Sequence, residues 1–232
     1  MVVYKALSKA GFQVQHTLVI RRESKVSLEE SSQGQHVLEP DQWLYNLTLF
    51  ESLTHWFWIS GHLILTEWVY SPVYLVLMLY SVFFWNTSHF YVVHRLLHWP
   101  PLYRIAHELH HRNVNTGPWS GISMHPLEHL MYFSVFLLWW VVPVHPVIIL
   151  LTGFFQGLSP AVSHSGFDQL TLPASKKVRV GDHFYHLHHK HFEVNYGNMP
   201  TPLDRVFGSW HEGTTATHAL MKCRKRLVLN SG

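Results

Sequence analysis

The sequence predicts an all-α integral membrane protein, built from two helical hairpins with a histidine-rich part on the cytoplasmic side. Of its 232 residues, 47% are hydrophobic and 13% are charged, against ~25% charged residues in a typical soluble domain. Lys and Arg are absent from residues 26–94 and 113–175, and basic residues flank both stretches. Because Lys and Arg collect in cytoplasmic loops, each stretch should leave the cytoplasmic side and return to it.

Each of these two stretches has room for a pair of helices. Residues 72–93, PVYLVLMLYSVFFWNTSHFYVV, are long enough to cross ~30 Å of hydrocarbon at ~1.5 Å per residue. An earlier helix over residues 44–69 is more polar and should be amphipathic or inward-facing. In the second stretch, residues 130–142 and 146–155 are each short for a span. Together they predict a hairpin that need not cross fully; the alternative is a pair of buried helices in a soluble core.

Composition divides the chain into three segments. Residues 1–40 are a polar N-terminal cytoplasmic arm, residues 41–213 are the membrane domain, and residues 214–232 are a basic tail. The N-terminus lacks the long apolar core and cleavage site of a signal peptide. A lone cysteine, Cys223, excludes an internal disulfide and a cysteine-rich zinc site. The net charge of +3 is too small to indicate a nucleic-acid partner.

The chain concentrates its histidines in short stretches. Residues 94–111, HRLLHWPPLYRIAHELHH, hold five of the 21 histidines. His94 and His98 are four residues apart, and His107, His110 and His111 have spacings of three and four, so each set shares one helix face. A neutral imidazole is a common ligand of iron, zinc and copper. These histidines are too many for one tetrahedral zinc, which takes three or four ligands, so we expect two metal ions.

The same spacing returns later in the chain. His125 and His129 are four residues apart, and His188 and His189 are adjacent. On spacing alone, the strongest candidate ligands are His94, His98, His107, His110, His111, His188 and His189. Isolated histidines, among them His16, His145 and His218, are interpreted as structural.

Six boxes in this order carry a family resemblance. They are HRLLH (94–98), HELHH (107–111), MHPLEH (124–129), SHSG (163–166), HLHHKHFEVNYG (186–197) and PLDRVFGSWHEG (202–213). The chain resembles the fatty acid hydroxylase/sterol desaturase superfamily over roughly residues 70–213. The resemblance implies about four membrane helices under a cytosolic helical cap that carries the boxes. It places the protein in the endoplasmic reticulum membrane of a eukaryote or in a bacterial inner membrane.

The resemblance also implies a reaction and its cofactors. Members of the superfamily are non-haem di-iron oxidoreductases that use O₂ and two electrons. They hydroxylate or desaturate a C–H bond of a lipid, either a sterol or a fatty acyl chain. The electrons come from NAD(P)H through a separate reductase with cytochrome b5 or ferredoxin.

Spacing and resemblance together give one set of expected residues. The expected metal ligands are His94, His98, His107, His110, His111, His125, His164, His186, His188 and His189. The residues expected to support these imidazoles through hydrogen bonds are Glu108, Glu128, His129 and His183.

The last box departs from the usual family pattern, His-x-x-His-His. Its first position is Tyr185 in this chain. His186 or His183 is expected to take the place of the missing histidine, with His186 preferred. On a helix, residue 186 is turned by ~100° from residue 185, so this substitution needs an irregular backbone. Tyr185 itself is not expected to bind metal.

Two other functions fit parts of the pattern. If the metal site is damaged at Tyr185, the protein would be a catalytically inactive lipid-binding or regulatory member of the superfamily. The second alternative is a zinc membrane hydrolase, because HELHH satisfies His-Glu-x-x-His with His107, Glu108 and His111. The additional His110 and the other boxes favour two metals.

Overall fold

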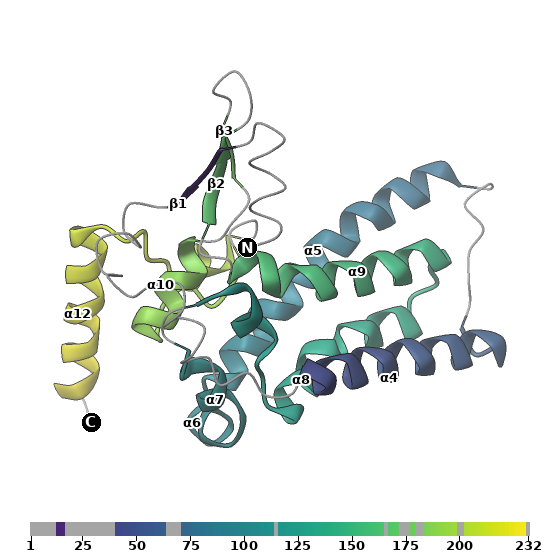
Figure 1. Cartoon of the computed structure of the whole chain (residues 1–232), viewed down its shortest axis with the longest axis horizontal. Helices are drawn as coiled ribbons and strands as arrows, with labels where there is room; N and C mark the ends of the chain where they lie inside the picture. The colour runs from purple at the N-terminus through teal and green to yellow at the C-terminus, as the bar shows by residue number, and fades with distance from the viewer. Residues whose placement is uncertain are drawn as a thin grey trace.

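The computed structural model is mainly helical. It describes residues 13–16, 40–63, 71–113, 116–164, 167–171, 177–179, 183–198 and 202–230. Helices α4 (Pro40–Ile59), α5 (Pro72–Leu97), α8 (Pro126–Phe133) and α9 (Pro146–Ser163) form a bundle at one end (Figure 1). Helices α7 (Glu108–His111), α10 (His183–His191) and α12 (Thr215–Asn230) lie at the other end. The histidine boxes therefore gather where the long helices end.

Helix α5 (Pro72–Leu97) runs from the far end of the bundle into the histidine-rich end. Ser71 caps it, since its Oγ accepts a hydrogen bond from the backbone N of Tyr74 at 3.3 Å, and Pro72 follows at the first helical position. The helix confirms the predicted segment 72–93 and continues four residues further. That extension brings His94 into the site.

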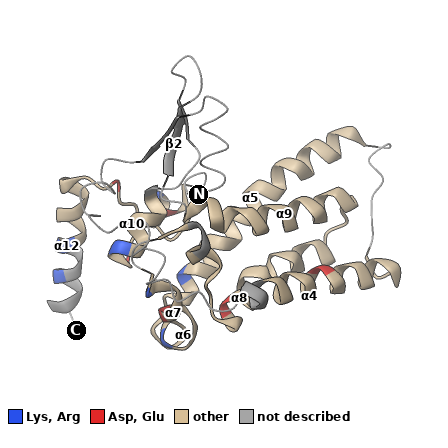
Figure 2. Ribbon diagram, viewed as in Figure 1, with Lys and Arg blue, Asp and Glu red and all other residues tan. Residues whose placement is uncertain are grey.

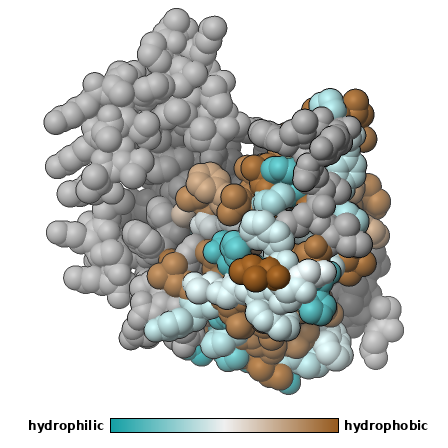
Figure 3. Space-filling model, turned by 90° about the vertical axis from the view of Figure 1, so that its right-hand side faces the viewer, coloured by the Kyte–Doolittle hydropathy of each residue, from teal (hydrophilic) through white to brown (hydrophobic). Residues whose placement is uncertain are grey.

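Two of the described helices are long and apolar enough to cross a membrane, namely α5 and α9 (Pro146–Ser163). Large apolar side chains on both point away from the protein: Val76 and Tyr80 on α5 are 64% and 76% exposed, and Phe154 on α9 is 69% exposed. Hydrophobic side chains also cover much of the described surface at the free end of the bundle (Figure 3). Such a surface suits lipid rather than water.

The bundle core lies between α4 (Pro40–Ile59), α8 (Pro126–Phe133), the 3₁₀ segment η4 (Ser134–Trp140) and α9. Its fully buried residues include Phe133, Phe136 and Ile148. Hydrogen bonds from indole N–H groups link different elements of the core. For example, Trp139 Nε1 in η4 donates a hydrogen bond to Thr152 Oγ1 in α9 at 2.8 Å. This indole nitrogen is thereby paired inside the apolar core, as a buried polar group requires.

The predicted helix boundaries hold in part. The helix expected over residues 44–69 begins at Pro40 and ends at Ile59, and residues 64–70 lie outside the described part. The hairpin expected over residues 130–155 is present as α8, η4 and α9. Its first arm ends in a 3₁₀ segment, and its second arm continues to Ser163.

A small sheet corrects the expectation of an all-α chain. Strands β1 (Gln13–His16), β2 (Phe167–Thr171) and β3 (Lys177–Arg179) form an antiparallel sheet in that order. It joins part of the predicted N-terminal arm to the segment that follows α9. Strands of three to five residues are too short for a clear alternation of apolar and polar residues, which explains why the sequence did not predict them.

Charge is distributed unevenly over the described helices. Helix α9 carries no Lys, Arg, Asp or Glu, and α5 carries only Arg95, near its C-terminal end. In Figure 2 the basic residues lie around α6, α7, α10 and α12, at the histidine-rich end. The predicted basic-free stretches thus correspond to the long bundle helices.

Candidate metal centre

Eight histidines converge in two groups at the end of the bundle. The first group consists of His94, His98, His107, His111 and His188, and the second of His110, His164 and His189. Within each group, the candidate ligand nitrogen atoms all lie within 4.8 Å of one another. All eight belong to the predicted ligand set, although they come from four separate segments of the chain.

Neighbouring histidines of one box belong to different groups. His110 and His111 follow each other on α7 (Glu108–His111), and His188 and His189 follow each other on α10 (His183–His191). Successive residues on a helix diverge by ~100°, so one ring of each pair turns to each group. Two short helices thus serve both groups.

His107 ends a π-helical turn, η2 (Tyr103–His107), which follows the short helix α6 (Pro100–Leu102). Such turns are rare and often occur at functional sites. Here the turn directly precedes α7, and the ring of His107 lies 4.6 Å from that of His111, centroid to centroid. The first and last histidines of HELHH therefore share the first group.

The Nε2 atoms of the first group, which point toward one another, are closely spaced. His107 Nε2 lies 3.1 Å from Nε2 of His94 and 3.1 Å from Nε2 of His98. His111 Nε2 lies 3.1 Å from that of His188. Two atoms that each bind one metal at ~2.0–2.1 Å lie roughly 3 Å apart. These separations fit a single ion among the five rings.

The second group is smaller and similarly spaced. His164 Nε2 lies 3.4 Å from Nε2 of His110 and 3.2 Å from Nε2 of His189. All three residues are at most 2% exposed. The separations again fit one common ion, with three nitrogen ligands.

The hydrogen bonds of the Nδ1 atoms, the second nitrogen of each ring, show which tautomer is present. Backbone carbonyl oxygens lie 2.6–3.2 Å from Nδ1 of His94, His110, His164 and His188. A carbonyl oxygen only accepts hydrogen bonds, so each of these Nδ1 atoms carries the proton and each Nε2 presents a lone pair to the interior. Converging lone pairs repel one another unless a cation lies between them. The donor set therefore fits a bound metal in each group.

Burial keeps these rings neutral. It is the main cause that lowers the pKa of His107, His111, His188 and His189 well below the ordinary value, and neighbouring histidines lower it further. The pKa of His110 is lowered to about 4, again chiefly by burial. Neutral imidazole is the form that binds metals, so these rings are in the metal-binding form at neutral pH.

Glu128 lies where the sequence predicted a supporting carboxylate. In the first turn of α8, it is 3% exposed, and its Oε1 accepts a hydrogen bond from His107 Nδ1 at 2.8 Å. The contact orients the His107 ring toward the first group.

Glu108 is placed differently from the prediction. Its side chain is 51% exposed and lies 3.8 Å from Arg112, on the outer side of α7. It does not face the histidine groups, and Glu128 takes the supporting role instead. The His-Glu-x-x-His interpretation loses its general base in this arrangement.

The remaining predicted residues lie outside the two groups. His125 caps α8, because its Nδ1 accepts a hydrogen bond from the backbone two residues later at 3.2 Å. His186 is half-buried on α10 and belongs to neither group. His129 is buried beside them, with Nε2 3.3 Å from the carbonyl of Ile122. The side chain of His183 lies outside the described part of the structure.

Asp204 holds the loop that follows α10. This residue of α11 (Leu203–Val206) is 3% exposed and accepts hydrogen bonds from the backbone N of Tyr196 at 2.9 Å and of Gly197 at 2.8 Å. It also accepts one from Ser209 Oγ at 2.6 Å. The carbonyl of Tyr196 in turn accepts from His94 Nδ1. Asp204 thus positions a ligand candidate through the backbone.

Close packing also fixes His164. Gly121 lies in η3 (Pro118–Ile122), and a Cβ at this position would come 2.7 Å from His164 Nδ1 and still closer to the carbonyl oxygen of Pro160. That carbonyl accepts the Nδ1 hydrogen bond of His164 at 2.8 Å. A larger residue at position 121 would displace the His164 ring and the Pro160 carbonyl, so glycine is needed for this close approach.

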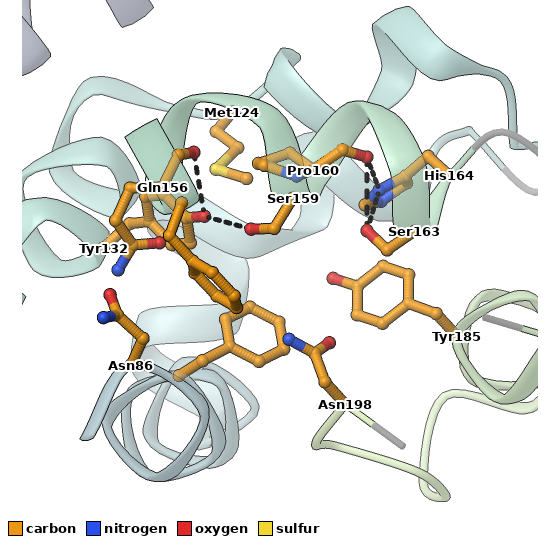
Figure 4. Close-up of a pocket in the computed structure, with 12 residues that line it drawn as sticks. Asn86, Met124, Tyr132, Gln156, Ser159, Pro160, Ser163, His164, Tyr185 and Asn198 are labelled. Carbon is orange, nitrogen blue, oxygen red and sulfur yellow. Dashed lines mark hydrogen bonds between the residues drawn. The ribbon is translucent and has the colours of Figure 1, made fainter. Parts of the chain in front are cut away.

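A pocket lies beside the second group (Figure 4). Its lining comes from α5, α8, α9 and α10 and includes His164 and Tyr185. Farther from the histidines it is lined by Asn86, Tyr132 and Gln156. The pocket is therefore lined both by residues of the two membrane-length helices and by His164 of the second histidine group.

Sequence reasoning missed a third histidine group, formed by His191, His211 and His218. The ring of His191 lies 5.1 Å from those of both other residues, centroid to centroid. They come from α10, the loop that follows α11, and α12 (Thr215–Asn230). Sequence spacing carries no signal for a group assembled from three such segments.

Comparisons with known proteins identify curated relatives. The chain is 30% identical to the Delta(7)-sterol 5(6)-desaturase of Saccharomyces cerevisiae over 137 residues, which are 59% of this chain and 36% of that protein. It is 32% identical to methylsterol monooxygenase 1 of Gallus gallus over 121 residues, 51% of this chain and 41% of that protein. The matched part thus spans about two fifths of these relatives. No solved structure matches the chain.

A family profile covers the region of both histidine groups. The Fatty acid hydroxylase family matches residues 78–209, more than half of the chain. All eight histidines of the first and second groups lie within this match. The chain belongs to the Fatty acid hydroxylase family.

Proposed function

We propose that this protein is a membrane di-iron oxidoreductase that uses O₂ to hydroxylate or desaturate a C–H bond of a lipid, either a sterol or a fatty acyl chain. One observation carries the proposal: two groups of neutral histidines present converging lone pairs beside a pocket between membrane-length helices. Relatives named as a sterol desaturase and a methylsterol monooxygenase support the reaction class.

The protein's own residues hold and shield the metals. Five imidazoles would hold one iron and three the other, and the irons would supply the O₂ and electron chemistry that amino-acid side chains lack. Backbone carbonyls and Glu128 fix the ring orientations. Burial of the rings excludes water from the reacting bond. In this proposal the lipid would reach the second group through the pocket, which His164 lines.

The membrane placement follows from charge and exposure. In this proposal α5 and α9 cross the bilayer, α4 and the α8–η4 arm complete about four membrane helices, and the lipid enters between α5 and α9. The basic residues near α7 and α10 (Figure 2) support a cytoplasmic position for the histidine end. The membrane is the endoplasmic reticulum in a eukaryote or the inner membrane in a bacterium. A separate reductase with cytochrome b5 or ferredoxin would deliver electrons from NAD(P)H at this end.

Metal content tests the proposal directly. The full chain would be purified in detergent from cells grown on iron-57 and analysed by elemental analysis and Mössbauer spectroscopy. We expect about two irons per chain that are magnetically coupled, and turnover of a sterol or acyl lipid with a reductase and O₂. A protein that binds no iron would overturn the proposal. One zinc per chain with hydrolytic activity would favour the hydrolase, and two irons without turnover would favour the inactive lipid-binding protein.

Replacing Glu128 by glutamine is expected to weaken metal retention by about 10- to 100-fold. Glutamine still accepts the hydrogen bond from His107 but removes the negative charge beside the cation. The measurement is the rate at which a chelator removes iron from the purified protein. Glu108→Gln, one residue from His107 but exposed, is the matched control and should behave as the unmodified protein. If Glu108→Gln weakened retention and Glu128→Gln did not, the original sequence-based role of Glu108 would stand.

Gln156 is expected to select lipids that carry a polar group. Asn86 Oδ1 and Gln156 Nε2 line the pocket, and both atoms are buried without a hydrogen-bond partner in the described part of the structure. They offer a substrate hydroxyl one acceptor and one donor. Gln156→Leu should lower kcat/KM for a hydroxyl-bearing sterol by about 10-fold or more and leave the iron content unchanged. Equal losses for that sterol and for its counterpart without the hydroxyl would contradict this role.

A further inference from the structure

We propose that the phenolic oxygen of Tyr185 is the fourth protein ligand of the second histidine group and binds its metal as a phenolate. The inference rests on the proposed function, because it requires a metal in that group. It assigns a role to the residue at which the last histidine box departs from the family pattern. It also reverses the expectation that Tyr185 takes no part in metal binding.

The two groups are unequal in their nitrogen donors. The first has five imidazoles, whereas the second has three. Neither His186 nor His125, the other predicted ligands, belongs to the second group. A fourth donor must therefore be sought among residues other than histidine.

The position of Tyr185 meets this need. It is 2% exposed, and its hydroxyl oxygen lies 3.5 Å from Nε2 of His110. That distance is close to the 3.4 Å between the Nε2 atoms of His110 and His164. The tyrosine ring lies 4.5 Å from the ring of His164 and 5.2 Å from that of His189, centroid to centroid. Its oxygen therefore lies close to one nitrogen of the second group, and its ring lies beside the other two imidazoles of that group.

Helix geometry explains why the tyrosine is the residue that faces the metals. Tyr185, His188 and His189 follow the i, i+3, i+4 spacing on α10, so their side chains share one face. His186 is turned by ~100° from Tyr185 and leaves that face. The regular helix therefore offers a phenol, and not the neighbouring imidazole, at the first position of the box.

Charge favours an anionic ligand at this point. The eight imidazoles are neutral ligands, so two divalent ions would bring four positive charges into a buried site. Glu128 contacts His107 of the first group. A phenolate would offset charge at the second. Binding breaks the phenol O–H bond, forms a metal–oxygen bond and releases the proton to solvent, with no change in electrons.

A visible spectrum tests the assignment without reference to activity. The full-length protein would be loaded anaerobically with Fe(II) and oxidised with ferricyanide. A phenolate bound to Fe(III) produces a charge-transfer absorption in the visible and enhances tyrosine ring modes in resonance Raman spectra. We expect both signals, and we expect the Raman modes to shift when the protein is made with ring-deuterated tyrosine. This labelling needs no variant and so does not depend on the folding of one.

Two variants then locate the tyrosine. Tyr185→Phe should lose the absorption band and the ring modes, whereas Tyr196→Phe should keep them. Tyr196 is a matched control because its ring lies 4.9 Å from that of His98, beside the first group. Tyr185→His should also lose the band while keeping about two irons per chain, since it restores the usual box.

The outcomes separate the inference from the proposed function. Two irons per chain without a tyrosinate signal would overturn the inference and leave the di-iron proposal intact. A band that survives in Tyr185→Phe would also overturn it. A protein that binds no iron would overturn the proposed function, and the inference with it.

Discussion

Replacing His188 by alanine is expected to lower the iron content from about two to about one per chain and to reduce turnover by well over 100-fold. His188 is fully buried, and its Nε2 lies 3.1 Å from those of His98 and His111 in the first group. Removing its imidazole takes away a ligand and leaves a cavity that alanine does not fill. Iron per chain by elemental analysis, with lipid turnover on the same sample, measures the effect.

His186→Ala is the control, two residues away on the same helix. His186 belongs to neither group, so this variant should keep both irons and most of the turnover. Circular dichroism would show that both variants retain their helices. Loss of iron in His186→Ala together with full iron in His188→Ala would refute the arrangement of α10 described above. It would instead support the irregular backbone that the sequence pattern allowed.

Replacing Asp204 by alanine is expected to cost about 3 kcal/mol or more of the free energy of unfolding. Each buried donor that loses its partner costs roughly 1–3 kcal/mol, and Asp204 accepts from Tyr196 N, Gly197 N and Ser209 Oγ. The loop would also loosen its hold on His94, so the first iron should be released faster. Chemical unfolding in a fixed detergent, followed by circular dichroism, measures the first effect, and chelator-driven iron loss measures the second.

A graded series sharpens this test. Asp204→Asn keeps one acceptor oxygen and should lie between the alanine variant and the unmodified protein. Glu212→Ala removes an exposed carboxylate from the following loop and should change the free energy of unfolding by less than about 0.5 kcal/mol. Equal stability of Asp204→Ala and Glu212→Ala would show that the loop is held by other contacts.

Parts of the fold followed from local pattern, and parts did not. The apolar run after Ser71 predicts α5 because length and composition decide a helix of this kind. The three short strands depend on pairing between residues far apart in the sequence, such as Gln13 with Thr171. Local pattern contains no information about such pairing, so the sheet was not predicted.

The site shows the same division at the level of single residues. Spacing predicted seven of the eight histidines in the first and second groups, and the family resemblance added His164. Neither predicted how they divide, because His110 and His111 turn to opposite groups. Residue type favoured Glu108 and His186, yet the backbone turns both away from the two groups. Glu128, which the sequence also predicted, contacts His107, and Tyr185 shares a helix face with His188 and His189. At these positions, the direction in which the helix turns a side chain determines whether it faces the histidine groups, and residue type alone does not predict that direction.

The division of adjacent histidines between two groups has a mechanical consequence. Consecutive Cα atoms are held ~3.8 Å apart by covalent bonds, and each of the pairs on α7 and α10 would carry both ions. The separation between the two ions would then be limited by the backbone of α7 and α10. Because α5 also supplies His94 to the first group and α9 ends at His164 of the second, a change of lipid or detergent that tilts α5 against α9 would act on the ligand distances at each ion more than on the distance between the ions.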